Sequence, residues 1–178
     1  MFVALDLPES TRDGLATWRD RLVEGRRDMR PVAPTALHVT LVFLGWQDES
    51  AAERIGAAAF GAAPESAPPR LAAVGVRPLP PRDPRLFALD LEDEGKRASA
   101  LHTAVSGALE AGGWYRPEKR PFWPHVTLAR VKRGVRRASP LPEEPPPGEP
   151  FEARQLTLYR STLRPQGALY EPLARVNI

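Results

Sequence analysis

His38-Val-Thr-Leu-Val-Phe43 and His125-Val-Thr-Leu-Ala-Arg130 begin with the same four residues and use two of the three histidines in the chain. Alternate side chains of an extended strand share a face, so each copy places its His and Thr on one side and its Val and Leu on the other. The β-branched and aromatic composition of both stretches favours strands. We therefore expect two central strands whose His and Thr side chains face one cleft.

The segments around these two copies alternate between strand and helix patterns. We predict an α+β fold in which residues 1–178 form a single domain of two pseudo-symmetric lobes. Each lobe has a mainly antiparallel sheet with helices on the outside, and the two motif strands line a central cleft. Strands are expected at 2–7, 37–44, 71–76, 86–91, 122–131, 151–163 and 168–176, helices at 10–24, 49–63 and 94–111, and a proline-rich surface loop at 139–150.

The composition excludes several classes of protein. The chain has 178 residues, 42% of them apolar, which is enough for a buried core. It contains no cysteine, so disulfide scaffolds, thiolate catalysis and cysteine-ligated zinc are excluded. The N-terminus lacks the basic region of a signal peptide, and no apolar stretch is long enough to span a membrane. We expect a cytoplasmic monomer.

The net charge is only +3, but the basic residues are clustered around the two motif copies. Solvated loops would explain any one cluster. Clusters beside both copies favour a polyanionic ligand, because such a surround raises its affinity and its rate of association. Phosphate is the natural candidate. The clusters are Arg26, Arg27 and Arg30; Arg116, Lys119 and Arg120; and Arg130, Lys132, Arg133, Arg136 and Arg137.

The repeated His and Thr are better suited to proton transfer than to metal binding. A lone strand histidine is usually structural, but a His paired with Thr in both copies points to a shared site. Two histidines with no Cys, Asp or Glu in either motif leave a transition-metal sphere incomplete, and threonine is a poor ligand for such ions. A Gly-x-Ser-x-Gly elbow and a glycine-rich phosphate loop are both absent. His102 lies in a predicted helix, so we interpret it as structural or exposed.

Metal-free phosphodiester chemistry fits these residues. Cleavage of a P–O bond needs a base, an acid, and donors to the non-bridging oxygens. The two histidines can supply the first two roles and the two threonines the third. One imidazole must then be neutral and the other protonated when the reaction starts.

Several stretches together resemble the bacterial and archaeal RNA 2',3'-cyclic phosphodiesterases, also called 2'-5' RNA ligases, of the two-histidine phosphoesterases. The resemblance runs from Phe2 to about Leu173. It implies hydrolysis of a 2',3'-cyclic phosphate at an RNA end to a 2'-phosphate, with reversible 2'-5' joining in some members, and no metal or other cofactor. The stretches are Phe2–Pro8, His38–Gly45, Arg120–Arg130 and Leu158–Leu163, followed by Tyr170.

The resemblance also implies roles for individual residues. His38 would protonate the leaving 3' oxygen, His125 would activate water, and Thr40 and Thr127 would donate to phosphate oxygens. Arg130 matches the family as a phosphate or base contact, but strict alternation turns it away from His125 unless a bulge intervenes. The remaining candidate substrate-binding residues are Phe122 and Tyr159, which can stack a base.

Val42 departs from the family pattern, and Phe43 is expected to lie outside the site. Many relatives carry Lys or Arg where this chain has Val42, so one charge of the cleft is missing or supplied elsewhere. Phe43 is interpreted as a core residue.

Two other functions remain open from the sequence. The same pair of histidines could serve a small cyclic nucleotide or ADP-ribose cyclic phosphate. The basic and aromatic residues would also suit a non-catalytic module that binds RNA ends. The leading hypothesis has as its partner RNA with 2',3'-cyclic phosphate ends, tRNA fragments included.

Overall fold

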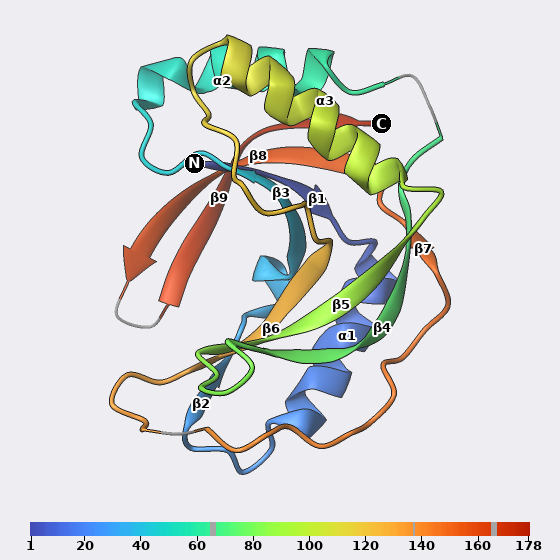
Figure 1. Cartoon of the computed structure of the whole chain (residues 1–178), viewed down its shortest axis with the longest axis vertical. Helices are drawn as coiled ribbons and strands as arrows, with labels where there is room; N and C mark the ends of the chain where they lie inside the picture. Colours follow the sequence, from blue (N-terminus) through green and yellow to red (C-terminus); the bar gives the residue numbers. More distant parts are fainter. Residues whose placement is uncertain (65–66, 137, 165–166) are drawn as a thin grey trace.

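In the computed structural model, which describes residues 1–64, 67–136, 138–164 and 167–178, nine strands form one curved sheet (Figure 1). The strands are β1 (Phe2–Asp6), β2 (Met29–Pro31), β3 (His38–Phe43), β4 (Arg70–Leu79), β5 (Leu86–Glu94), β6 (His125–Val131), β7 (Phe151–Glu152), β8 (Gln155–Arg164) and β9 (Gly167–Asn177). The helices are α1 (Glu9–Leu22), α2 (Ala52–Gly61) and α3 (Arg97–Ala111), with 3-10 turns η1 (Pro34–Ala36) and η2 (Glu49–Ala51).

The sheet consists of two half-sheets that meet at the motif strands. Its order is β7-β4-β5-β6-β3-β1-β8-β9, with β2 paired to β6 and all pairs antiparallel. The register between β3 and β6 contains one residue pair, Val39 with Val126. The predicted α+β fold with two lobes is therefore confirmed, and the lobes are joined through one continuous sheet.

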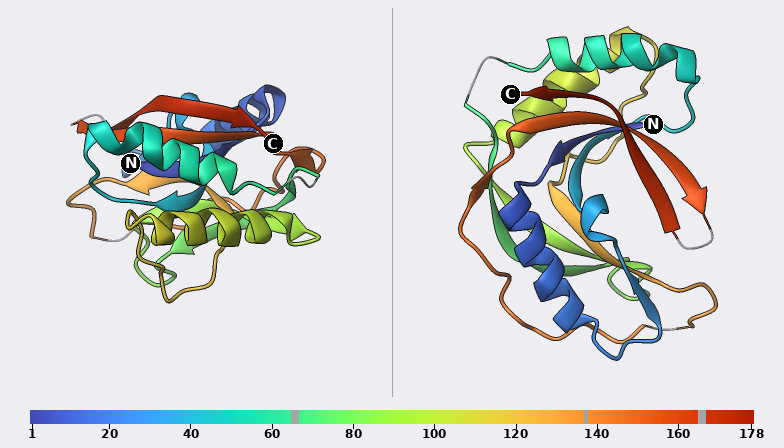
Figure 2. Two further views of the ribbon diagram at one scale, coloured as in Figure 1. Left: turned by 90° about the horizontal axis from the view of Figure 1, so that it is seen from above. Right: turned by 180° about the vertical axis from the view of Figure 1, so that it is seen from behind.

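The helices lie outside the sheet at its two ends (Figures 1 and 2). α2 and α3 contact each other, and α3 also contacts both β3 and β5, so it spans the junction of the half-sheets. α1 lies at the other end beside β4. Leu15, Trp18 and Leu22 of α1 are almost fully buried, because spacings of three and four residues place them on one face of the helix.

The helix predicted at 94–111 begins three residues later, at Arg97. Gly95 and Lys96 both have positive φ, which no helix continues through. Asp93 then caps the helix, because its carboxylate accepts hydrogen bonds from the backbone N–H groups of Ala98 at 2.9 Å and Ser99 at 2.8 Å. Glu94 belongs to β5.

Several other boundaries also differ from the sequence-based expectation. The strand predicted at 122–131 begins at His125, since Pro124 lacks the N–H that a paired strand needs. The strand predicted at 151–163 is divided into β7, which pairs with β4, and β8, which pairs with β1. Met29–Pro31, for which no strand was predicted, forms β2, which pairs with β6 and buries Met29. The strands predicted at 71–76 and 86–91 are present as β4 and β5, which pair with each other and extend to Leu79 and Glu94.

The Asp93 cap generates a prediction about stability. Asp93→Ala is expected to lower the free energy of unfolding by about 1 to 2 kcal/mol, since two N–H groups at the start of α3 lose their acceptor. Urea unfolding measures this difference. Glu92→Ala is the matched control, because Glu92 is exposed and precedes the cap by one residue. Equal stability of the two variants would contradict the proposed cap.

Candidate active site

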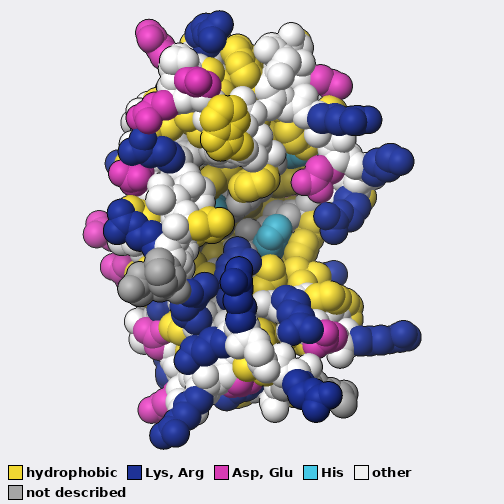
Figure 3. Space-filling view, turned by 90° about the vertical axis from the view of Figure 1, so that its left-hand side faces the viewer, with side chains coloured by type: hydrophobic (Ala, Val, Ile, Leu, Met, Phe, Trp, Pro, Cys, Tyr) yellow, Lys and Arg dark blue, Asp and Glu magenta, His cyan; other side chains and the backbone are white. Residues whose placement is uncertain are grey.

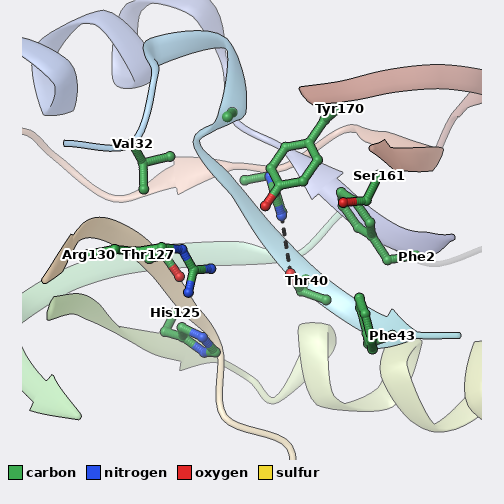
Figure 4. Close-up of a pocket in the computed structure, with 11 residues that line it drawn as sticks. Phe2, Val32, Thr40, Phe43, His125, Thr127, Arg130, Ser161 and Tyr170 are labelled. Carbon is green, nitrogen blue, oxygen red and sulfur yellow. Dashed lines mark hydrogen bonds between the residues drawn. The ribbon is translucent and has the colours of Figure 1, made fainter. Parts of the chain in front are cut away.

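The junction of β3 and β6 turns both motif copies toward the same side. Val39 and Val126 are fully buried, so the His and Thr on either side of each valine point to the opposite face. That face forms a cavity of about 130 Å³, here called the histidine cleft (Figure 4). It is lined by Phe2, Val32, Ala36, His38, Thr40, Phe43, His125, Thr127, Arg130, Ser161 and Tyr170.

A β-bulge follows the threonine in both copies. Opposite β1, Thr40 and Val42 pair with successive residues, which leaves Leu41 extra. Opposite β5, Thr127 and Ala129 pair with successive residues, which leaves Leu128 extra. Each bulge shifts the alternation by one residue, so that the second residue after the Leu faces the cleft.

The two bulges determine whether three residues of the motif strands point to the cleft or to the core. Arg130 lies in the histidine cleft, as the resemblance required, because the bulge in β6 turns it there. Phe43 also lines the cleft and is 60% exposed, so its assignment to the core was wrong. Val42 is 1% exposed and lies in the core, so a charge in its place would not face the cleft.

His38 lies in a mostly aromatic environment on the β3 side of the cleft. Its Nε2 is 3.1 Å from Thr40 Oγ1, the hydrogen bond drawn in Figure 4. The ring stacks on Phe2 with centroids 4.9 Å apart and meets Tyr170 edge-on at 5.2 Å. The pKa of His38 is lowered from 6.5 to about 4, mainly by burial. The nearby charges of His125 and Arg130 also lower this pKa, whereas a hydrogen bond with the Ala36 backbone raises it.

Tyr159 lies beneath this environment and does not line the cleft. It is 8% exposed, stacks on Phe2 at 5.1 Å, and donates a 2.7 Å hydrogen bond to Asp6. Burial and the Asp6 carboxylate raise the pKa of its hydroxyl to about 12. Its placement contradicts the prediction that Tyr159 contacts substrate, because Tyr159 is buried and does not line the cleft, although its ring centroid is only 6.0 Å from that of His38. Tyr170 and Ser161 of the β8–β9 hairpin line the cleft instead.

His125 is held by the segment that precedes β6. Its Nδ1 lies 2.8 Å from the carbonyl oxygen of Trp123. Because a carbonyl can only accept, Nδ1 carries the proton and donates it, and Nε2 is the ring nitrogen that is available to a ligand. The Trp123 ring stacks on the imidazole at 4.3 Å. The indole Nε1 in turn donates to Asp90 at 2.5 Å, and Asp90 forms an ion pair with Arg77. The ring of His125 is therefore fixed from two directions.

The two histidines have matching supports. Asp6 is the cross-strand partner of His38, and Asp90 is the cross-strand partner of His125. Each carboxylate accepts a hydrogen bond from an aromatic side chain, Tyr159 in one lobe and Trp123 in the other. A second repeated tetrapeptide, Ala4-Leu-Asp-Leu7 and Ala88-Leu-Asp-Leu91, contains the two aspartates, whereas their aromatic partners Tyr159 and Trp123 share no such pattern.

Positive charge gathers on one side of the cleft. Figure 3 shows a histidine in a hollow, with most Lys and Arg side chains below it and hydrophobic side chains above. Arg30 of β2 lies directly opposite Arg130 of β6, which adds a second guanidinium near the cleft. Arg26 has another role: it pairs with Asp28 and donates to the carbonyls of Ser139 and Pro140. Arg137 lies outside the described residues.

The remaining predicted residues also have definite places. Phe122 lies next to the cleft and stacks on His102 at 4.5 Å, so the third histidine is part of this region of the surface. The segment 139–150 has no helix or strand and borders β4 and α1.

A signal for the bulges was present in the sequence. Leu41-Val42 and Leu128-Ala129 are consecutive apolar pairs at the same point of both copies, and such a pair breaks the period of two.

Two further properties concern metals and membranes. Within the described part of the chain, no three side chains among His, Cys, Asp and Glu come together as a metal site would require. None of the helices described here is long and apolar enough to cross a bilayer.

The fold and the paired His-x-Thr strands place this chain among known proteins. It matches the 2'-5' RNA ligase superfamily over residues 7–164 and belongs to that family, as the sequence resemblance predicted. The RNA 2',3'-cyclic phosphodiesterase of Thermus thermophilus is 32% identical over 100% of this chain and 89% of its own length. The protein of the same name from Escherichia coli is 30% identical over 98% and 94%. The crystal structure of TT0787 from Thermus thermophilus has a TM-score of 0.77 at 32% identity, covering 99% of this chain and 96% of that one.

The burial of His38 predicts how its ring titrates. We expect His38 to stay neutral until the pH falls to about 4, because its aromatic surroundings disfavour the imidazolium. Proton NMR of the three histidine rings measures this, and the His38→Ala variant assigns the resonance. Titration of His38 near its ordinary value of 6.5 would contradict the described burial.

The hydrogen bond from Trp123 to Asp90 predicts that replacing Trp123 lowers stability more than replacing Trp46 does. Trp123→Phe is expected to lower the free energy of unfolding by about 1 to 3 kcal/mol, since it keeps an aromatic ring but loses the hydrogen bond to Asp90. Trp46→Phe is the matched control, because Trp46 is 87% exposed, and we expect it to change stability by less than about 0.5 kcal/mol. Equal effects in urea unfolding would show that the indole N–H contributes nothing to stability.

Proposed function

We propose that this protein hydrolyses 2',3'-cyclic phosphate ends of RNA to 2'-phosphates without a metal ion, using His38 and His125 as an acid–base pair. The observation that carries the proposal is that one cleft gathers both His-Thr pairs and Arg130. The shared name of the two curated relatives supports the same reaction class, hydrolysis of a phosphodiester.

The proposed reaction is a single displacement at phosphorus. Water attacks the phosphorus atom and loses a proton to His125, while the bond from phosphorus to the 3' oxygen breaks. His38 donates a proton to that oxygen, and the phosphate remains on the 2' oxygen. When a 5'-hydroxyl replaces water as the nucleophile, the same transfers produce a 2'-5' phosphodiester, which is the joining reaction expected from the resemblance.

The assignment of the acid sets a requirement on His38. In the free protein its pKa is about 4, so at neutral pH the ring is neutral and cannot donate the proton that the leaving oxygen needs. A phosphodiester anion beside an imidazolium stabilises the charged form. Bound substrate must therefore raise the pKa of His38, and the histidine becomes an effective acid only once the cleft is occupied.

Thr40, Thr127 and Arg130 are proposed to bind the phosphate oxygens. The Thr40 hydroxyl, next to His38 Nε2 in the free protein, can rotate toward a non-bridging oxygen. The Arg130 guanidinium can donate two parallel hydrogen bonds to the same phosphate. These donors stabilise the charge that develops on the oxygens during displacement.

The proposal is tested with an RNA oligonucleotide that carries a 2',3'-cyclic phosphate, incubated with the protein in EDTA. We expect a 2'-phosphate end, and His38→Ala or His125→Ala should lower the rate by about 10² to 10⁴. His102→Ala is the matched control, because His102 lies outside the histidine cleft, and its effect on the rate constant at saturating substrate should be small.

Other outcomes would identify the alternatives. A strong preference for the mononucleotide over the oligonucleotide would favour a phosphodiesterase of small cyclic nucleotides. Binding of the cyclic end without conversion would favour a non-catalytic module. Full activity in either catalytic variant, or activity that EDTA abolishes, would overturn the proposed mechanism.

A further inference from the structure

A second cavity adjoins the histidine cleft and is about three times larger. Its volume is about 400 Å³, and we call it the His102 cavity. Thr40, Phe43 and His125 line both cavities, so the two cavities lie next to each other at these residues. The remaining lining residues are Leu41, Leu79, His102, Ser106, Tyr115, Pro117, Glu118, Arg120, Pro121, Phe122 and Trp123.

The two cavities differ in volume, so each can hold a different part of a ligand. About 130 Å³ holds a phosphate but not a nucleotide, whereas about 400 Å³ lies within the range of small-molecule sites. In a nucleoside 2',3'-cyclic phosphate, the base is attached one ribose carbon away from the phosphate ester. A phosphate in the histidine cleft therefore leaves the base to lie in an adjoining space.

Flat side chains border the His102 cavity. Phe122 and His102 stack with centroids 4.5 Å apart and planes 13° apart, so a base can extend this stack on the outer face of one of the two rings. Burial lowers the pKa of His102, so its ring is neutral near pH 7. Ser106 lies one helical turn after His102 on the same face of α3, which adds a hydroxyl near the stack.

The charge of the cavity suits a neutral group better than a phosphate. Arg120 is accompanied by Glu118 at 3.7 Å, so the two charges offset each other. Arg130 lies in the histidine cleft, on β6. A phosphate is therefore attracted toward Arg130 on β6, whereas a base can lie against the rings of Phe122 and His102.

We propose that the His102 cavity binds the nucleobase of the nucleotide that carries the cyclic phosphate, with Phe122 and His102 as its stacking surface. This inference rests on the proposed function, since it places the reacting phosphate in the histidine cleft. It gives a role to His102, which the sequence had marked as structural or exposed.

The test compares two substrates that differ only in the base: adenosine 2',3'-cyclic phosphate and methyl riboside 2,3-cyclic phosphate. Phe122→Ala should raise KM for the adenosine compound about tenfold to a hundredfold, which is the effect of losing one stacking contact. The rate constant at saturation and both constants for the methyl riboside should not change. Phe122→Tyr should restore the wild-type KM, since it keeps the ring.

The controls separate base binding from a structural effect. Trp46→Ala removes an exposed aromatic side chain that lines neither cavity, and it should leave KM for both substrates unchanged. An unchanged KM for the adenosine compound in Phe122→Ala would overturn the proposal. An equal rise for both substrates would also overturn it, because Phe122 would then support the cleft without contacting a base.

A binding measurement distinguishes this proposal from the proposed function. If the wild-type protein hydrolyses neither compound, calorimetric titration with adenosine 2'-phosphate and methyl riboside 2-phosphate decides about the cavity, while the oligonucleotide assay tests the proposed function separately. Tighter binding of the adenosine compound that Phe122→Ala abolishes would support the base site. Equal affinity of the wild-type protein for both compounds would overturn it.

Discussion

The pairing of Val39 with Val126 is the contact on which the rest of the structure depends. Both side chains are fully buried, and they bring β3 and β6 together at the centre of the two motif copies. Because the side chains of a strand alternate, burying the two valines turns two histidines and two threonines to the opposite face. A shift of one residue in either strand would reverse this arrangement and bury the polar side chains in the core.

The pseudo-symmetry of the site extends beyond the repeated tetrapeptide. Both strands have a bulge after the threonine, and both histidines face an aspartate across the sheet. The two supports differ in chemistry, however. Trp123 stacks on His125 with centroids 4.3 Å apart, whereas the ring of His38 is packed among Phe2, Tyr159 and Tyr170. The lobes thus share a plan while giving their two histidines different environments.

The sequence predicted most of the fold and the centre of the site. The period of two in the motif strands and the three-and-four spacing in α1 are local patterns, so they can be read without knowing the partners of each segment. Tyr159 and Phe43 were misjudged because their exposure depends on the register of β8 and on the bulge in β3. The start of α3 was missed because Lys96 adopts a positive φ that is uncommon outside glycine.

The crossing of the chain between β7 and β8 has a consequence for folding. β7 completes one half-sheet and β8 the other, although only two residues, Ala153 and Arg154, separate them. The hydrogen bond from Tyr159 to Asp6 joins positions 153 residues apart. Pairings of such long range make loop closure slow and high in entropic cost. During synthesis, β1 therefore lacks one of its two neighbours until Gln155–Arg164 has left the ribosome, and the surroundings of His38 cannot be completed before that point.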